Sequence, residues 1–185
     1  MTEKQRKLIC QSSRLALYSL SVEDADAVYR YRIHPEVALY QTWTLNSPRD
    51  VTDYANEMAK RKPFTFGEVE QIVLMSLDTK EVIGDLAVTI DTDTNQTAEL
   101  GVAINPCFQK QGYGFEALKT LCEFLFNEMN LHRIHVAIDP RNNASLNLFE
   151  KLTFRTEGHL IESYFHNGEW TDDVLMGVLK REWMC

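Results

Sequence analysis

Amide, lysine and glycine residues crowd into one short loop, QKQGYG, at positions 109–114. An apolar pattern with helical spacing begins directly after it. The first N–H groups of a helix have no partner within the helix and lie at the positive end of its dipole. Because glycine lets a ligand approach the backbone closely, the loop predicts a phosphate-binding site, to which Lys110 adds a charge. The alternative is a plain loop in which the glycines only turn the chain.

The string Gly112-x-Gly114-x-x-Ala117 also fits a dinucleotide-binding fingerprint, with Asp139 as the acid that would bind a ribose. In that fingerprint the first glycine closes the preceding strand, whereas here the segment NPCFQKQ lies between them. Only one helix and one hairpin are expected downstream, too few for further parallel βα units. The sequence therefore argues against a dinucleotide-binding fold.

The elements around this loop predict an α/β protein with a mixed sheet. Ser21 with Asp24, and Ser47 with Pro48, are typical helix starts, and Asn167-Gly168 predicts a hairpin turn. The expected elements are a strand at 14–20, helices at 21–34 and 47–60, strands at 71–77, 81–90 and 97–104, a helix at 112–129, a strand at 133–139, a helix at 143–152, and strands at 154–165 and 170–179.

This order, β-α-α-β-β-β-α-β-α-β-β, contains one strand-helix-strand unit at 97–139, which should be right-handed with parallel strands. The length of 185 residues suits a single domain over residues 1–185, with residues 1–13 as a candidate flexible N-terminal extension.

Composition excludes several classes of protein. The net charge of −8 argues against a nucleic-acid binder, which needs clustered Lys and Arg, and mildly favours a cationic partner. The cysteines are scattered without a C-x-x-C pair, so we expect free thiols in a reducing compartment. We recognise neither a signal peptide nor a membrane span, and therefore expect a cytoplasmic protein with no membrane partner.

The loop and its neighbours resemble the GNAT acetyltransferases, whose loop pattern is Q/R-x-x-G-x-G/A. The segments AELGVAINPCFQKQGYGFEAL, LHRIHVAIDPRNNASLNLFEKLTF and YFHNGEWTDDVLMGVLKREW are similar to the RimJ/RimL-type branch, as is the opening RLALYSLSVEDADAVYRYRIHPEV. The resemblance covers residues 14–183. It implies a GNAT-like fold with splayed central parallel strands, and transfer of acetyl from acetyl-CoA, as co-substrate, to an amine.

The resemblance also assigns residues to the acetyl-CoA site. Backbone of the strand before the loop would pair with the pantetheine arm, Asn142 would contact the cofactor, and Phe149 would pack against it. The strand residues are Val102, Ala103 and Ile104, and the diphosphate would lie on the loop residues Gln109, Lys110, Gln111, Gly112, Tyr113 and Gly114.

Acyl transfer to an amine needs a base for the amine proton and a donor for the leaving sulfur. Glu99 is the candidate base, because it shares a strand face with the small residues Gly101 and Ala103 and stands where similar enzymes place a glutamate. A solvated strand glutamate is the alternative. Asp85, on the neighbouring strand, is a weaker substitute near the acceptor.

The residue that assists the leaving sulfur is less clearly marked. Many family members carry a tyrosine where this chain has Phe149, which cannot donate a proton. Ser145 matches the serine of the family's N-x-x-S pattern and is the candidate donor, although a first-turn serine often bonds only to local backbone. Thr153 stands where the family usually has glycine, which puts the tightness of that turn in question.

The resemblance implies an acceptor site between the first two helices and beside the last hairpin, where Tyr40, Trp43 and Tyr164 are candidates, with Trp170 beside them. Each could instead be packing. The acceptor would be a protein N-terminus or a small amine, and the alternative function is a non-catalytic acyl-CoA-binding or regulatory protein. We expect no metal, reading His132-x-x-His135 as structural, and a homodimer is considered.

Overall fold

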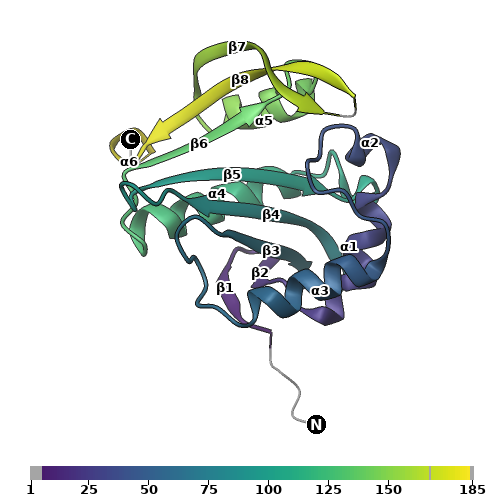
Figure 1. Cartoon of the computed structure of the whole chain (residues 1–185). Coiled ribbons are helices and arrows are strands. Elements are labelled where there is room, and N and C mark those ends of the chain that lie inside the picture. The colour runs from purple at the N-terminus through teal and green to yellow at the C-terminus, as the bar shows by residue number, and fades with distance from the viewer. Residues whose placement is uncertain (1–5, 167, 184–185) are drawn as a thin grey trace.

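The computed structural model describes residues 6–166 and 168–183. An eight-stranded mixed sheet in the order β1-β2-β3-β4-β5-β6-β8-β7 runs through the molecule (Figure 1). The strands are β1 (Leu8–Gln11), β2 (Leu15–Ser19), β3 (Val69–Ser76), β4 (Val82–Ile90), β5 (Thr97–Ile104), β6 (Arg133–Ile138), β7 (Arg155–His166) and β8 (Glu169–Leu179). The helices are α1 (Ala25–Arg32), α2 (Pro35–Ala38), α3 (Pro48–Met58), α4 (Tyr113–Asn127), α5 (Asn143–Lys151) and α6 (Lys180–Trp183), with short 3₁₀ turns at Val22–Asp24 and Pro106–Phe108.

Helices cover both faces of the sheet. The larger core packs α4 and the buried side of α5 against one face, and a second core packs α1 and α3 against the other. Alternate side chains of β5 point to opposite faces of the sheet and so contribute to both cores. Ala98 and Leu100 belong to the larger core, and Ala103 belongs to the second. The predicted α/β class and mixed sheet are confirmed.

Local sequence explains where the first helices start. A capping box forms at Ser21 with Asp24, as predicted. Ser47 is the N-cap of α3 with Pro48 in the first turn, also as predicted, and it forms a further capping box with Asp50. The first predicted helix is interrupted, because the chain is extended at His34 and Pro35 then starts the separate short helix α2.

The N-terminal segment differs from the prediction. Residues Leu8–Gln11 form the edge strand β1, which pairs antiparallel with β2, so this part of the expected extension belongs to the sheet. Residues 1–5 lie outside the described residues, as does Asn167 of the predicted Asn-Gly turn, whereas Gly168 has the positive φ of 86° expected there. No described helix is both long and apolar enough to cross a membrane.

The two central parallel strands separate after a short paired stretch. β5 pairs with β6 only from Thr97 to Glu99, opposite Arg133 to His135. Beyond Glu99, β5 continues beside β4 and β6 continues beside β8, and the two strands diverge (Figure 1). The β5 residues after Glu99 therefore have a strand on one side only, which leaves backbone groups along an open edge.

Candidate active site

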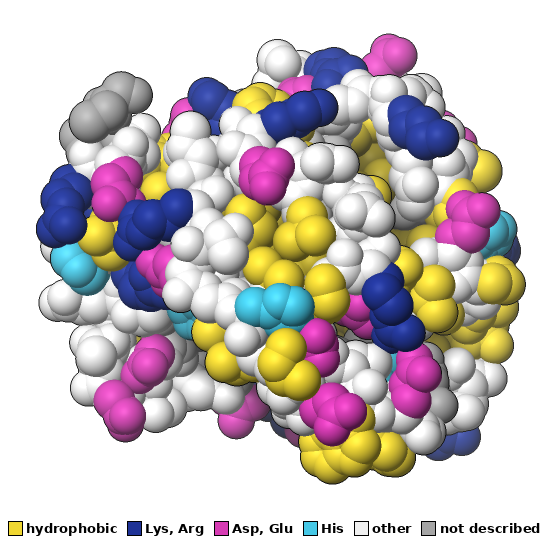
Figure 2. All heavy atoms as spheres, turned by 90° about the horizontal axis from the view of Figure 1, so that it is seen from above, with side chains coloured by type: hydrophobic (Ala, Val, Ile, Leu, Met, Phe, Trp, Pro, Cys, Tyr) yellow, Lys and Arg dark blue, Asp and Glu magenta, His cyan; other side chains and the backbone are white. Residues whose placement is uncertain are grey.

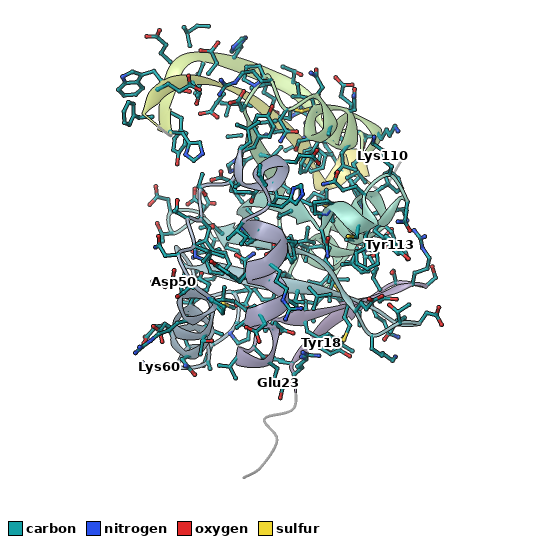
Figure 3. All side chains as sticks on the ribbon, turned by 90° about the vertical axis from the view of Figure 1, so that its right-hand side faces the viewer. Tyr18, Glu23, Asp50, Lys60, Lys110 and Tyr113 are labelled. Carbon is teal, nitrogen blue, oxygen red and sulfur yellow. The ribbon has the colours of Figure 1, made fainter. Side chains whose placement is uncertain are left out.

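A cavity of about 740 Å³, which we call the loop cavity, opens between this free edge of β5 and the first turns of α4 and α5. The predicted strand residues Val102, Ala103 and Ile104 all line it. So do Gln109, Lys110, Gly112, Tyr113 and Gly114 of the loop. Lys110 and Tyr113 lie on the side of the molecule away from Asp50 of α3 (Figure 3). The structure thus brings the predicted loop and strand together around one space.

The loop is shaped to present backbone N–H groups. Gly112 precedes α4 with φ of 83°, a left-handed conformation that glycine adopts without strain, and Lys110 has φ of 59°. The N–H groups of Tyr113, Gly114 and Phe115 belong to the first turn of α4, where no acceptor within the helix can reach them. With the helix dipole they make a site for an anion.

The two glutamines of the loop hold the loop itself. Gln109 Nε2 donates to the Ile104 carbonyl at 3.1 Å, and Gln111 Nε2 donates to the Cys107 carbonyl at 3.1 Å. Gln111, unlike Gln109, is not among the residues that line the loop cavity. The side chain of Gln111 therefore stabilises the conformation of the loop.

Arg14, which the sequence marked only as a strand start, braces the loop from behind. Its guanidinium lies 4.4 Å from the ring centre of Tyr113, donates to the Gln111 carbonyl at 3.3 Å, and pairs with Glu116 at 2.6 Å. Burial raises the pKa of Glu116, but hydrogen bonds from Ser12 and Arg14 outweigh it, and the net pKa is lowered. The turn between β1 and β2 is thereby tied to the start of α4.

Helix α5 closes the far side of the loop cavity. Asn142 caps this helix, its side-chain oxygen accepting from the Ser145 N–H at 3.1 Å, and both residues line the cavity. Phe149 differs from the prediction, because it is 0% exposed and packs edge-on against Phe154 with ring centres 5.0 Å apart. It is a core residue that is absent from the cavity lining, since α5 turns that face toward the sheet.

A second cavity of about 420 Å³, the sheet cavity, lies over β3, β4 and β5 and is bounded by α1, α3 and the segment between α2 and α3. Glu99 and Gly101 of β5 line it, as the strand alternation predicts. The loop cavity and the sheet cavity share Gln41 and Val102. They meet where β5 leaves β6.

Gln41 was not singled out by the sequence, yet it stands at this junction. It accepts from Arg32 Nη1 at 3.3 Å and donates to the Val102 carbonyl at 3.4 Å. Its side chain thereby links α1 to the open edge of β5. A single glutamine between two predicted helices carries no recognisable signal, so only the structure could reveal it.

Asp85 does not face the acceptor space as predicted. It is 0% exposed, and Arg32 donates to both of its carboxylate oxygens, at 2.6 and 2.7 Å. The guanidinium also lies 4.8 Å from the ring centre of Trp43. Arg32 lines the sheet cavity, whereas Asp85 is not among its lining residues. Asp85 therefore influences the cavity only by holding the Arg32 side chain and neutralising its charge.

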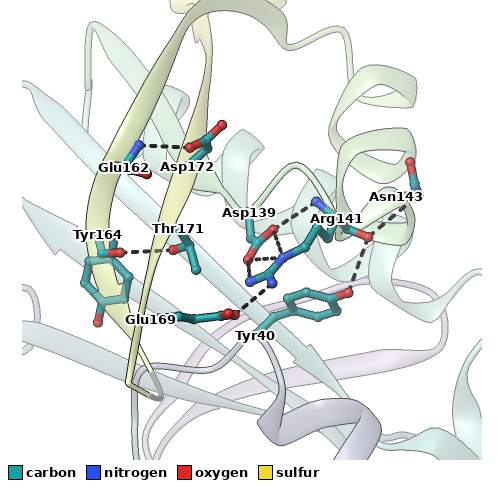
Figure 4. Close-up of polar contacts among 9 residues, drawn as sticks. All are labelled: Tyr40, Asp139, Arg141, Asn143, Glu162, Tyr164, Glu169, Thr171 and Asp172. Carbon is teal, nitrogen blue, oxygen red and sulfur yellow. Dashed lines mark hydrogen bonds and ion pairs between the residues drawn. The ribbon is translucent and has the colours of Figure 1, made fainter.

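The aromatic residues predicted to line the acceptor site lie in different places in the structure. Trp43 lines the sheet cavity and packs against Tyr54 with ring centres 5.2 Å apart, whereas Tyr40 lines the loop cavity. The Tyr40 hydroxyl donates to the Arg141 carbonyl at 3.3 Å (Figure 4). Tyr164 lies on β7, 40% exposed and outside both sets of lining residues (Figure 4).

The last hairpin is joined to the site through Arg141. Its guanidinium pairs with Asp139 at 2.6 Å and with Glu169 at 2.8 Å, which ties the end of β6 to the start of β8 (Figure 4).

Apolar side chains of β7 and β8, including Ile161 and Trp170, are exposed. On the face seen from above, hydrophobic side chains gather in several patches with acidic and basic side chains scattered between them (Figure 2).

His135 is the cross-strand partner of Glu99 at the last paired position before the strands diverge. Burial lowers the pKa of His135, and the charge of Glu99 opposes this only in part. At neutral pH the imidazole beside Glu99 is therefore uncharged. Within residues 6–166 and 168–183, no cluster of three or more His, Cys, Asp or Glu side chains could hold a metal ion.

The mixed sheet, the splayed parallel strands and the anion-binding helix start are the arrangement that the resemblance to the GNAT acetyltransferases implies. The family model described as acetyltransferase (GNAT) domain matches residues 14–155, and the chain belongs to this family. It is an acetyltransferase.

Curated relatives carry compatible names. The uncharacterized N-acetyltransferase p20 of Bacillus licheniformis is 28% identical over 176 residues, covering 93% of this chain and 96% of that protein. Spermidine N(1)-acetyltransferase of Escherichia coli is 26% identical over 91 residues, 49% of each chain. The ribosomal protein uS5-alanine N-acetyltransferase of Escherichia coli is 29% identical over 130 residues, covering 69% of this chain and 64% of that protein.

Solved structures show the same fold. A GNAT acetyltransferase from Bacillus anthracis superposes with a TM-score of 0.83 at 24% identity, covering 94% of this chain and 99% of that chain. Spermidine N-acetyltransferase from Vibrio cholerae, in complex with CoA and spermine, superposes with a TM-score of 0.81 at 22% identity, covering 94% and 100%.

Proposed function

We propose that this protein transfers acetyl from acetyl-CoA directly to a primary amine while both substrates are bound. The observation that carries the proposal is the meeting of the loop cavity and the sheet cavity at Gln41 and Val102. One space offers an anion site and an open strand edge to acetyl-CoA, and the other holds a carboxylate beside the acceptor. The family relationship and the CoA-bound structural relative support the choice of donor.

The loop cavity supplies groups that fit acetyl-CoA. The N–H groups at the start of α4 suit the diphosphate, and Lys110 of the loop and Lys151 at the end of α5 supply cationic groups. The open edge of β5 offers the backbone groups of Val102 and Ile104 to the pantetheine amides, as an added strand would use them, whereas the backbone groups of Ala103 pair with β4. The thioester would then lie near the junction with the sheet cavity.

In the reaction, the amine nitrogen attacks the thioester carbonyl carbon, the new C–N bond forms, and the C–S bond then breaks. Glu99 takes the proton that the amine loses, and an N–H on the open edge of β5 stabilises the negative oxygen of the tetrahedral intermediate. The sulfur leaves as a thiolate that takes up one proton. Ser145, which lines the loop cavity, is the candidate hydrogen-bond donor to that sulfur.

Thiol release from acetyl-CoA, followed against a panel of amines and peptides, tests this function. We expect Glu99→Gln to lower kcat/KM at neutral pH by about 100-fold, the usual range for a general base, with an unchanged KM for acetyl-CoA. Full activity in Glu99→Gln would show that another group is the base. Binding of acetyl-CoA without turnover on any amine would favour the alternative function, a non-catalytic acyl-CoA-binding or regulatory protein.

The cytoplasmic location and the RimJ/RimL-type branch remain part of the same proposal. Similarity to the ribosomal protein uS5-alanine N-acetyltransferase supports the branch. It leaves a protein N-terminus and a small amine open as acceptors, which a comparison of the two kinds of acceptor would resolve.

A further inference from the structure

The floor of the sheet cavity is built from residues in register across β3, β4 and β5. Gln71 is the cross-strand partner of Ala87, which is the partner of Gly101, and Glu99 lies on the same face two residues before Gly101. Neighbouring strands lie about 4.8 Å apart, so the Cα atoms of Gln71 and Gly101 are about 10 Å apart. Only the small side chain of Ala87 lies between them, which leaves room for a ligand.

Gln71 carries an unsatisfied donor in this floor. It is 4% exposed, and its Nε2 has no hydrogen-bond partner among the described residues. Buried polar groups in native proteins are nearly always hydrogen-bonded, because an unpaired donor is unfavourable. Since Gln71 lines the sheet cavity, an oxygen atom of a bound ligand can supply the missing acceptor.

The charges of the cavity limit how many ammonium groups a ligand can carry. Among the described residues that line it, Glu99 is the carboxylate and Arg32 the cation. Asp85 is fully buried and already occupied by two hydrogen bonds from Arg32. A second ammonium group would therefore lie near a guanidinium and would find no free carboxylate.

The walls favour an apolar part in the ligand. Trp43 and Tyr54 pack against each other and both line the sheet cavity, as does Val69. Aromatic and aliphatic walls stabilise an apolar group by burying its surface. The volume of about 420 Å³ suits a small molecule.

Resting on the proposed acetyl transfer, we propose that the acceptor is a small monoamine with an apolar body and one hydrogen-bond-accepting oxygen, and that Gln71 binds this oxygen. The amine lies toward Glu99 and the oxygen toward β3. An oxygen-free polyamine chain is a poor acceptor, because it leaves Gln71 Nε2 unpaired and places ammonium groups beside Arg32.

The test compares phenylalaninamide with phenethylamine, which lacks the carboxamide oxygen, and with spermidine, in the thiol-release assay. Rates are expressed per unprotonated amine, because the amines differ in basicity. We expect kcat/KM for phenylalaninamide to exceed that of both others by about 10-fold or more, since a site built around a hydrogen bond rejects the analogue that lacks it. Equal or faster turnover of spermidine or phenethylamine would overturn the proposal.

Gln71→Leu removes the donor while keeping most of the volume. We expect the preference for phenylalaninamide over phenethylamine to fall to within about 3-fold, with an unchanged KM for acetyl-CoA. Gln11→Leu, the same substitution on the distant edge strand β1, should keep the preference. An unchanged preference in Gln71→Leu would overturn the role of Gln71.

Failure of the proposed function gives a different result. If no amine releases thiol, the acetyl transfer is contradicted, and the acceptor proposal is decided by calorimetric titration of phenylalaninamide and phenethylamine into the CoA-loaded protein. Tighter binding of phenylalaninamide, lost in Gln71→Leu, supports the proposal. Equal binding of the two amines overturns it.

Discussion

Replacing Arg32 by methionine should strongly destabilise the protein, because it leaves Asp85 as a buried carboxylate without a counter-charge. The side chain of Asp85 is 0% exposed and that of Arg32 5% exposed, and the two hydrogen bonds between them are 2.6 and 2.7 Å long. Breaking a buried ion pair by removing one partner costs about 3–5 kcal/mol. Loss of the cation–π contact with Trp43 adds to this.

For a chain of this length, that loss lowers Tm by roughly 6–20 °C. Urea unfolding followed by circular dichroism measures the free energy of unfolding, and calorimetry measures Tm. Arg49→Met, which breaks the exposed pair of Arg49 with Asp53, is the matched control and should stay within about 0.5 kcal/mol of the unsubstituted protein.

The double variant Arg32→Met/Asp85→Leu decides whether the uncompensated charge is the cause. Replacing both partners of a buried pair by apolar residues is often neutral, so the double variant should be more stable than Arg32→Met alone. A cost below about 1 kcal/mol for Arg32→Met, or a double variant as unstable as the sum of the single changes, would refute this reasoning.

Further substitutions test other parts of the structure. Thr153 has φ of 65°, a conformation strained for a β-branched residue, so Thr153→Gly should raise the free energy of unfolding by about 1 kcal/mol, whereas Thr156→Gly within β7 should lower it. A Cβ at Gly84 would overlap a backbone carbonyl of β5, so Gly84→Ala should lower the free energy of unfolding by about 1–3 kcal/mol and raise the KM for acetyl-CoA. Gly158 has open space around it, so Gly158→Ala should leave that KM unchanged. The pKa of Glu116 is lowered from its ordinary 4.5, so its contribution to stability is present above pH 4.5 and is lost as the pH falls through the lowered folded value. Urea unfolding between pH 3 and pH 6 should accordingly show a flatter pH dependence in Glu116→Gln, and an unaltered slope would contradict this assignment.

Much of the fold could be predicted because the sequence patterns of single helices, strands and turns agreed with the way these elements pack in the structure. The capping boxes, the alternating strands and the loop before α4 each specify their own conformation within a few residues. β1 was missed because the four residues Leu8–Gln11 are too short to show a period, and they are ordered by pairing with β2.

The contacts within the site were harder to predict because they join distant parts of the chain. Arg32 and Asp85 are 53 positions apart, and nothing in either neighbourhood indicates that they form a pair. Gln71 looks like any polar residue within an apolar strand, and only its buried, unpaired amide and its place among the residues that line the sheet cavity distinguish it. The resemblance placed Phe149 against the cofactor, but the direction of this side chain depends on how α5 packs on the sheet, and there it lies in the core.

A crystal structure of the protein with bound CoA would show directly whether the loop cavity and the open edge of β5 bind the acetyl donor. We expect diphosphate oxygens within hydrogen-bond distance of the N–H groups at the start of α4, in the turn that contains Tyr113, Gly114 and Phe115. We also expect pantetheine amides paired with the open edge of β5 beside Val102. CoA bound away from both the α4 start and the β5 edge, or no CoA bound at saturating concentration, would contradict the proposed acetyl-CoA site.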